Sequence, residues 1–309
     1  MNLIGKRYFF FLFSALIIIP GLIIIAVWGL PFSVDFKGGS LLEAKFASGT
    51  LPDPARVIEV YTQMGVGNVQ VSTSGKDVLV IRSAVMDDTA RAKVLDLLSK
   101  TFNDTVTAQR FDTVGPSVSQ EVTSRAGVAL AAAALALVVY ISFAFRSVAH
   151  AFRYAIATIL ALIHDVLVIL SLVAIGSRLF SWQIDTLFLT ALLTVIAFSA
   201  QDTIVVFDRL RENSAALRKM NYETLVNHSV VQTLTRSINT QLMTVDFMLL
   251  AMALFGGSTL KEFAIVLLIG MLSGSYSSDF IAAPILVVWE NQEWKTWFKR
   301  NQRPAQANL

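Results

Sequence analysis

Four aspartates stand out because each lies in a stretch of sequence that is otherwise uncharged: Asp165, Asp202, Asp246 and Asp279. A charged side chain at the centre of a membrane helix costs about 2.5–3.5 kcal/mol on insertion scales, so such residues usually serve a function. The chemistry open to an intramembrane carboxylate is the uptake and release of a proton. The clearest case is Asp202, which follows an uncharged run and opens the stretch DTIVVFDRL.

The elements that hold these acids are predicted to be membrane helices. Of the 309 residues, 55% are hydrophobic and 15% are charged, whereas soluble domains carry about 25% charged residues. Runs of about 20 apolar residues, long enough to cross ~30 Å of hydrocarbon, predict six spans. They lie at 8–30, 126–145, 154–175, 184–207, 237–255 and 263–289. The first is predicted to be a retained anchor, because its apolar run is too long for a signal peptide.

Lysine and arginine gather at one set of span ends, and the positive-inside rule makes these ends cytoplasmic. Both termini are therefore predicted to be cytoplasmic. The predicted parts are an anchor helix at 1–30, an external (periplasmic) domain at 31–122, a five-helix membrane domain at 123–292 and a basic cytoplasmic tail at 293–309. Within the membrane domain, 208–235 is predicted to be a cytoplasmic loop that lies on the membrane surface, because it is basic and amphipathic.

The external segment is predicted to be a small α+β domain. Residues 34–46 predict a strand broken by a glycine pair, and a helix is expected between Asp53, as its cap, and Gly65, as its stop. Two alternating strands around SGKD predict a hairpin, a second amphipathic helix follows at 87–102, and 105–115 predicts a last strand. The order β-α-β-β-α-β is typical of a ferredoxin-like domain. The chain contains no cysteine and three histidines, and no nucleophile, metal or phosphate motif is present, so an enzyme is not expected.

Depth suggests a partner for Asp202. With a rise of 1.5 Å per residue, Asp202 lies about 8 Å from the cytoplasmic end of its span. Arg236, at the start of the fifth span, lies on the same side. An ion pair between them would lower the cost of burying both, and its loss would allow the aspartate to take up a proton. The spacing leaves two interpretations open, a proton relay and a static salt bridge that pins two helices.

The remaining acids have weaker assignments. Adjacent residues on a helix point about 100° apart, so His164 and Asp165 are expected to contact different neighbours rather than form one charge pair. Asp246 is expected at a similar depth and is a candidate for the same polar seam. Asp279 lies in SGSYSSDF, a small and polar stretch that favours close helix packing, and is expected to be structural.

Five blocks of this sequence resemble a known family, the SecD/SecF proteins of the RND transporter superfamily. The blocks are VDFKGG at 34–39, VGPSVSQEV at 114–122, ALIHDV at 161–166, FSAQDTIVVFDRLREN at 198–213, and RSINTQLMTV at 236–245 followed by FGG and GSYSS. The resemblance covers essentially the whole chain in order. It implies a fold of six transmembrane helices, half of an RND-type bundle, with a small ferredoxin-like external domain between spans one and two.

The family resemblance also implies a function. Its SecF members pair with SecD and assist export through the SecYEG channel, using the proton motive force to complete translocation of a preprotein. Further implied partners are YajC and YidC, and no nucleic acid or cofactor beyond protons is expected. The functional pair of the family maps onto Asp202 and Arg236, with His164, Asp165, Gln201 and Asp246 as secondary polar candidates. The remaining motif positions are expected to be structural: Asp35, Gly38, Gly39, Gly115, Pro116, Gly256 and Gly257.

The chain departs from the family pattern at several positions. Gln201 stands where the family has asparagine, and Asp246 and Asp279 are not part of the pattern. The side-chain amide at position 201 must therefore differ in geometry from the asparagine of the family. The two additional acids leave open which route the protons take. Two rival functions are a small-molecule or lipid exporter half of the same superfamily and a non-transporting scaffold of the translocon.

Overall fold

The computed structural model describes residues 2–74, 77–146, 151–180, 182–241, 247–255 and 258–297. The chain separates into two compact units. The first, called the sheet unit here, comprises 20–132 and 170–190, and the second, called the helical unit, comprises 1–19, 133–169 and 191–309. Each unit is described by itself.

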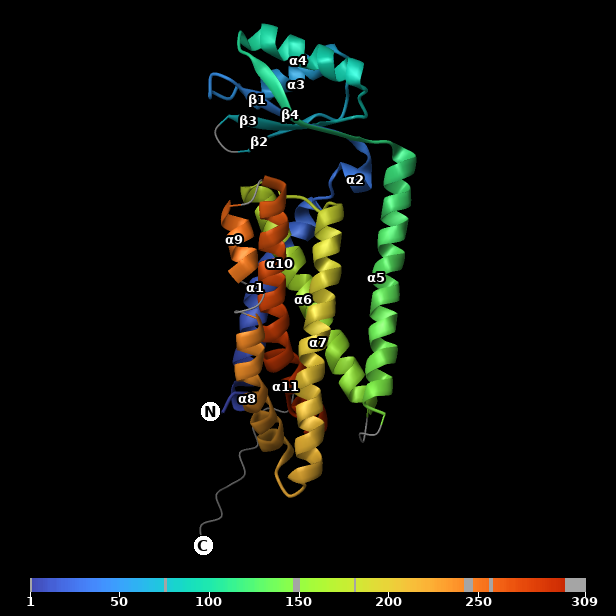
Figure 1. Ribbon diagram of the computed structural model, residues 1–309, viewed down its shortest axis with the longest axis vertical. Helices are drawn as coiled ribbons and strands as arrows, with labels where there is room; N and C mark the ends of the chain where they lie inside the picture. The colour runs from blue at the N-terminus through green and yellow to red at the C-terminus, as the bar shows by residue number, and fades with distance from the viewer. Residues whose placement is uncertain are drawn as a thin grey trace. The chain divides into compact units, whose positions relative to one another are not determined.

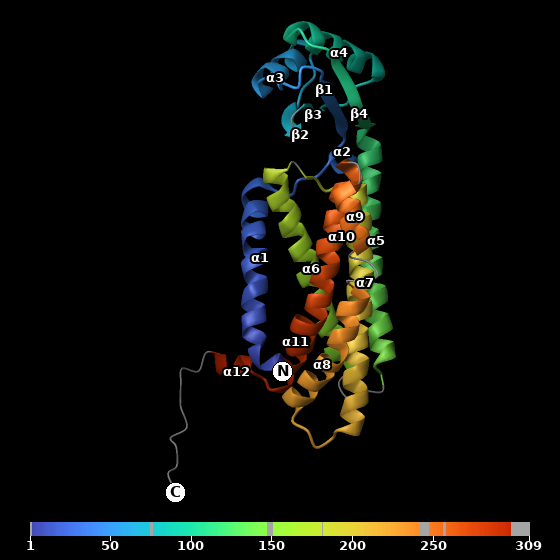
Figure 2. The ribbon, with the colours of Figure 1, turned by 60° about the vertical axis from the view of Figure 1, so that its left-hand side comes forward.

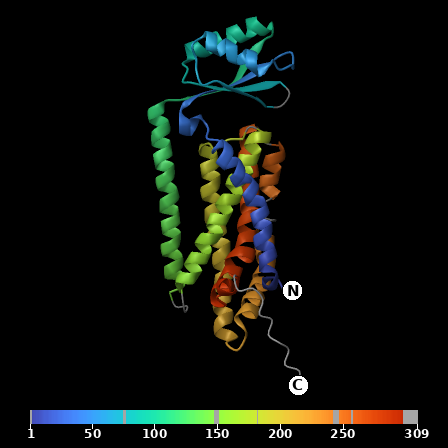
Figure 3. The same cartoon turned by 180° about the vertical axis from the view of Figure 1, so that it is seen from behind.

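A four-stranded antiparallel sheet forms the centre of the sheet unit (Figure 1). Its strands are β1 (Gly39–Phe46), β2 (Gln70–Ser74), β3 (Val78–Ser83) and β4 (Val106–Val114), arranged in the order β2-β3-β1-β4. Helices α3 (Pro54–Gln63) and α4 (Asp88–Phe102) cover the same face of this sheet, as Figures 1 and 3 show. The order along the chain, β1-α3-β2-β3-α4-β4, agrees with the order predicted from the sequence.

The helix ends in this domain follow local signals. Asp53 accepts a hydrogen bond from the Ala55 amide at 3.0 Å and caps α3 as predicted, and Gly65 follows the helix at φ +73°. Asp87 caps α4 by accepting from the Ala90 amide at 2.7 Å, and this backbone hydrogen bond lowers the pKa of the Asp87 carboxyl. The predicted inward residues of α4 all belong to the core beneath it: Ala90, Val94, Leu97, Leu98 and Phe102.

The strand expected from residue 34 starts later than predicted. Residues Val34–Lys37 form a one-turn helix, α2, because Ser33 caps them by accepting from the Asp35 amide at 3.2 Å. Gly38, at φ +74°, ends α2, and Gly39, at φ +126°, begins β1. Both conformations favour glycine, which explains the glycine pair.

Gly39→Ala is expected to destabilise the sheet unit by about 1–3 kcal/mol, the cost of a strained backbone position. A Cβ at Gly39 would lie 2.6 Å from the Ser83 carbonyl oxygen, in addition to the positive φ. The matched control is Gly67→Ala, because the space around Gly67 is open, and its expected effect is within about 0.5 kcal/mol. Thermal unfolding of the full chain in detergent measures both, and equal shifts would contradict the prediction.

Asp35 has a structural position at the start of helix α7 (Thr186–Ala216). Its Oδ2 accepts from the Thr186 amide at 3.0 Å and from the Thr186 hydroxyl at 3.1 Å. Asp185 accepts from the Phe188 amide at 2.7 Å, so two carboxylates cap the same helix, where they also complement its dipole. Burial raises the pKa of Asp185, and the nearby Asp35 carboxylate adds to that rise.

Five helices of the described residues are long and apolar enough to cross a membrane. They are α1 (Arg7–Trp28), α5 (Pro116–Ala144), α6 (Ala151–Leu179), α7, and α10 (Ser258–Ser277) continued by the π-helical segment η3 (Ser278–Ala282) and by α11 (Ala283–Glu290). The remaining helices are η1 (Ile4–Lys6), α8 (Tyr222–Gln241), α9 (Phe247–Phe255) and α12 (Trp294–Trp297).

The predicted fifth span, 237–255, is divided between two helices. Its first residues belong to α8, which is mostly polar, and its last nine form α9. A nine-residue helix is only about 14 Å long at 1.5 Å per residue. Residues 242–246, between the two helices, lie outside the described residues. The described part of the chain therefore supports five spans, not six.

The segment 208–235, expected to be a loop on the membrane surface, is largely helical. Only 217–221 separates α7 from α8, and the two helices run side by side in opposite directions (Figure 2). Arg209 donates to Gln232 at 2.7 Å, and Asn213 donates to Ser229 at 2.9 Å. The apolar face of α8 is buried in the main core of the helical unit through Leu225, Val226 and Val230. The apolar side of this amphipathic segment therefore packs against protein.

The N-terminal residues are fixed to helix α8 and to Glu293. Asn227 of α8 accepts hydrogen bonds from the amides of Leu3 and Ile4. Arg7 makes two contacts with Glu293, at 3.1 and 2.5 Å, and a third with Glu223 at 3.2 Å. Burial opposes ionisation of Glu293, but hydrogen bonds from Arg7 and other neighbours outweigh it and lower the pKa of the Glu293 carboxyl.

Candidate functional site

Of the intramembrane acids that the structure describes, Asp165 on α6 is the most enclosed, with a fully buried side chain. Three serine hydroxyls donate to it: Ser199 of α7 at 2.6 Å, and Ser273 and Ser277 of α10 at 2.7 Å each. His164 Nδ1 lies 3.1 Å from Asp165 Oδ1. Both carboxylate oxygens are therefore hydrogen-bonded, as polar groups buried in an apolar interior need to be.

His164 joins this cluster to the first span. Its Nε2 lies 2.8 Å from the Ser14 hydroxyl of α1, and its ring tilts against Tyr276. The expectation that His164 and Asp165 reach different neighbours holds, since one contacts α1 and the other α7 and α10. The two side chains also contact each other, because rotation of the imidazole side chain brings Nδ1 back to the adjacent carboxylate.

A second group of hydroxyls extends from this cluster towards Asp202. The Ser278 hydroxyl lies 3.3 Å from the Ser199 carbonyl oxygen and 2.8 Å from the Thr203 hydroxyl. Helices α7 and α10 approach closely here, since a Cβ at Gly274 would lie 2.9 Å from Ser199 Cβ. Ser199, Thr203 and Ser278 are buried, and Gly274 has no side chain. The three hydroxyl groups therefore form a polar seam between the two packed helices.

Asp202 is less enclosed than Asp165. Its Oδ1 accepts from the Ser237 hydroxyl of α8 at 2.9 Å. Its Oδ2 is buried and has no hydrogen-bond partner among the described residues. Ser275 of α10 and Arg236 of α8 are further polar neighbours. Asp202 is thus a half-buried carboxylate with one satisfied oxygen and one open oxygen.

The predicted ion pair between Asp202 and Arg236 is not formed. Among the described side chains, no salt bridge joins them, and Arg236 is exposed on α8. The residue that bonds Asp202 is Ser237, the next residue along α8. Gln201 is also exposed, and among the described residues no hydrogen bond joins its amide to Asp202, since successive helical residues point in different directions.

Asp279 lies nearer to Asp202 than the sequence suggested. It is 2% exposed, its Oδ1 has no hydrogen-bond partner in the described structure, and it interacts electrostatically with Asp202. Asp279 belongs to the π-helical segment η3, and such segments often occur at functional sites. Pro284 follows η3 and cannot donate the backbone hydrogen bond that a regular α-helix would need, which favours the wider turn. Asp279, which was expected to be structural, thus lies buried within electrostatic range of Asp202.

The other predicted positions lie apart from this site or beyond the described residues. Asp246, Gly256 and Gly257 are outside the described residues. Gly115 and Pro116 mark the point where β4 ends and α5 begins, and proline suits the first position of a helix.

Sequence reasoning missed the serines that hold Asp165. Ser273 and Ser277 are four residues apart, which places them on one face of α10, and this spacing was the available signal. Ser14 and Ser199 carry no such signal, since a single serine in an apolar run is common. The resulting arrangement is three acids inside a helix bundle, with hydrogen-bonded hydroxyl groups around Asp165 and between α7 and α10.

Comparison with known proteins agrees with this picture. Residues 93–292 match the family described as "Protein export membrane protein SecD/SecF, C-terminal". The chain is 60% identical, over 99% of its length and the full length of the relative, to the protein translocase subunit SecF of Anaerolinea thermophila. It is 34% identical, over 94% of its length, to 38% of the protein translocase subunit SecDF of Bacillus subtilis.

The fold agrees as well. A crystal structure of SecDF, a translocon-associated membrane protein from Thermus thermophilus, superposes with a TM-score of 0.81 and 27% identity. The match covers 94% of this chain and 39% of that chain, so this chain spans about two fifths of SecDF. With a family match over 93–292 and a relative this similar along its whole length, the chain belongs to the SecD/SecF family of protein export membrane proteins and, within it, to the SecF subunits.

Proposed function

We propose that this chain is an auxiliary subunit of the Sec preprotein translocase that acts with SecD and couples proton movement through the membrane to the completion of protein export. Membership in the SecF subunits supports the translocase role. The observation that carries the coupling is Asp202 and Asp279, two acids inside helices that cross the membrane, each with a buried carboxylate oxygen that has no hydrogen-bond partner among the described residues. Buried acids of this kind are costly and are retained where protons are moved.

Asp202 is the residue proposed to gain and lose the proton, with Arg236 as a charged neighbour. Its open oxygen is available for a proton, and its other oxygen is bonded to Ser237 of α8. Protonation would remove the negative charge of Asp202 and weaken its charge-assisted bond to Ser237. The packing of α7 against α8 would then depend on whether Asp202 carries a proton. In this way a change of charge at one residue would move a helix.

A SecD partner is supported by polar groups that this chain leaves uncovered. Gln201 and Arg236 are exposed on two helices that pack beside Asp202. In a membrane such groups require a polar partner, because lipid offers none. The SecDF relative contains additional chain beyond the part that resembles this protein, consistent with a second half that covers them. SecYEG, with YajC and YidC, and a translocating preprotein complete the proposed set of partners.

The proposed orientation places both termini in the cytoplasm of a bacterial inner membrane and the sheet domain on the periplasmic side, as the distribution of lysine and arginine favours. Residues 237–255 are proposed to complete a sixth crossing. The order β2-β3-β1-β4, with two helices on one face, supports a ferredoxin-like architecture for the external domain. This domain would contact the emerging preprotein.

Co-purification tests the assignment. The tagged full chain is expressed together with a SecD-like six-span protein and the SecYEG channel in the same membrane. We expect SecD to co-elute with the tagged chain, and the double variant Gln201→Leu/Arg236→Leu to weaken that association. Val139→Leu/Phe143→Leu, on an exposed apolar part of α5, serves as the control. A chain that purifies alone from such membranes, with export unaffected by its removal, would refute the proposal.

A further inference from the structure

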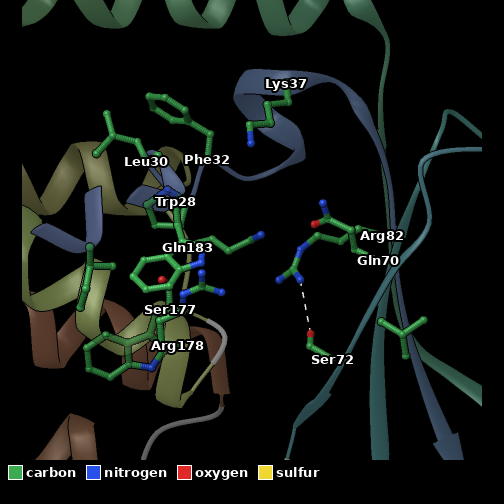
Figure 4. Close-up of a pocket in the computed structure, with 15 residues that line it drawn as sticks. Trp28, Leu30, Phe32, Lys37, Gln70, Ser72, Arg82, Ser177, Arg178 and Gln183 are labelled. Atoms are coloured by element: carbon green, nitrogen blue, oxygen red, sulfur yellow. Dashed lines mark hydrogen bonds between the residues drawn. The ribbon is translucent and has the colours of Figure 1, made fainter. Parts of the chain in front are cut away.

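The sheet unit contains a cavity of about 350 Å³ that the proposed proton chemistry does not use. It lies between the ends of α1 and α6 and the strands β2 and β3 (Figure 4). Its volume falls in the range of about 300–1,000 Å³ typical of small-molecule sites. Three cationic side chains line it, Lys37, Arg82 and Arg178, and none of the described lining residues is acidic.

The three cations come from different elements and point into the same space (Figure 4). Arg82 extends from β3 and contacts the Ser72 hydroxyl of β2 at 3.4 Å. Arg178 lies in the last turn of α6, with its guanidinium 4.3 Å from the centre of the Trp28 ring. Lys37 is the last residue of α2. Like charges held together in a cavity repel one another, so this arrangement is stabilised when an anion occupies it.

Two tryptophans at the ends of spans line the cavity. Trp28 is the last residue of α1 and Trp182 follows α6, and tryptophans at span ends mark the membrane interface. Trp182 is held in place because Gly176 leaves room for its ring, where a Cβ would lie 2.3 Å away. Arginine suits phosphate because its planar fork donates two parallel hydrogen bonds.

The rest of the lining extends toward the hydrocarbon. Ile24, Leu30 and Phe32 supply apolar surface on one side of the cavity. The neighbouring face of α1 is exposed and apolar at Ile23 and Val27, which are 56% and 64% exposed. A free phosphate would use only the cations, whereas a lipid uses both surfaces.

We propose that this cavity binds the phosphate of an anionic phospholipid headgroup, with the acyl chains of the lipid along the exposed face of α1. The bound phosphate joins the sheet, through Arg82, to the end of α6, through Arg178. An anionic lipid would thereby fix the position of β2 and β3 at the ends of the two spans.

Native mass spectrometry of the full chain in detergent tests this proposal. The probes are dioleoylphosphatidylglycerol, dioleoylphosphatidylcholine with the same acyl chains, and inorganic phosphate. We expect the tightest-bound phosphatidylglycerol to be held roughly tenfold more strongly than phosphatidylcholine, since each nearby cation strengthens binding of an anionic lipid. Lys37→Gln/Arg178→Gln, which changes two exposed residues, is expected to abolish that preference.

The matched control is Lys93→Gln/Lys100→Gln, which removes the same charge from exposed positions on α4 away from the cavity. It is expected to retain the wild-type preference. Equal retention of the two lipids by the wild type, or equal losses in both double variants, would overturn the proposal. Inorganic phosphate bound as tightly as the anionic lipid would assign the cavity to a free anion instead. Exclusion of both lipids by a soluble acidic peptide would assign it to a peptide, which would also overturn the proposal.

Discussion

Asp202→Asn is expected to abolish the response of late-stage protein export to the proton gradient, while the ATP-driven stage and assembly with SecD remain. Asparagine keeps a carbonyl oxygen that can accept from Ser237, so the α7–α8 contact survives. The expected change in stability is within about 1 kcal/mol, the typical net value of one hydrogen bond. The variant loses the carboxyl group at position 202, which can gain and lose a proton. Export in energised inverted vesicles, measured with and without an uncoupler, gives the result.

The matched control for this experiment is Asp208→Asn, on the same helix. Asp208 is exposed and pairs with Arg211 three residues on, so it has the same chemistry outside the buried site. Such an exposed pair contributes about 0–1 kcal/mol, and the control is expected to export like the wild type. A proton response that persists in Asp202→Asn, with the complex intact, would show that Asp202 only pins two helices.

Asp165→Ala is expected to cause the largest loss of stability, about 3–5 kcal/mol, because it removes the common acceptor of a buried polar cluster. Three serine hydroxyls and His164 would lose their partner at once. Asp165→Asn keeps one acceptor oxygen, and serine hydroxyls can turn to accept from the new amide, so a smaller loss of about 1–2 kcal/mol is expected. Thermal unfolding of the purified full chain, followed by tryptophan fluorescence, measures both.

The same pair of variants separates a structural role of Asp165 from a relay role. Because both oxygens of Asp165 are satisfied, we expect Asp165→Asn complexes that do assemble to keep their proton response. Ser273→Ala is the control for loss of one donor and is expected to cost about 1 kcal/mol. An Asp165→Asn variant with wild-type stability and no proton response would place Asp165 on the proton route.

Several features of the fold could be predicted from the sequence because their causes are local. Asp53 and Gly65 mark the ends of α3 through a cap and a left-handed turn, and both depend on neighbouring residues alone. The apolar runs of the five spans and the periodicity of α4 are likewise properties of the local sequence. The strand expected at Val34 was misplaced because Ser33 forms a cap there, a local signal that the alternating pattern obscured.

Helix α8 shows the limit of this reasoning. Its polar composition is typical of a surface segment, and the sequence contains no sign that Leu225 and Val226 would be buried in the main core of the helical unit. The hydrogen bonds of Arg209 and Asn213 to α8 span 23 and 16 residues along the chain. A helix that is partly polar can be buried only where a neighbouring helix offers hydrogen-bond partners. Tertiary packing brings those partners to it.

By itself, the sequence determined which residues are costly to place in a membrane, because the free-energy cost of a carboxylate depends on how apolar the surrounding run of residues is. The tertiary structure decided what each acid does. Asp165 is enclosed by serines 34, 108 and 112 residues away, whereas Asp202 keeps one open oxygen beside Asp279. The ability of a buried carboxylate to exchange a proton depends on the hydrogen bonds it receives, and those bonds come from helices that meet only when the chain folds.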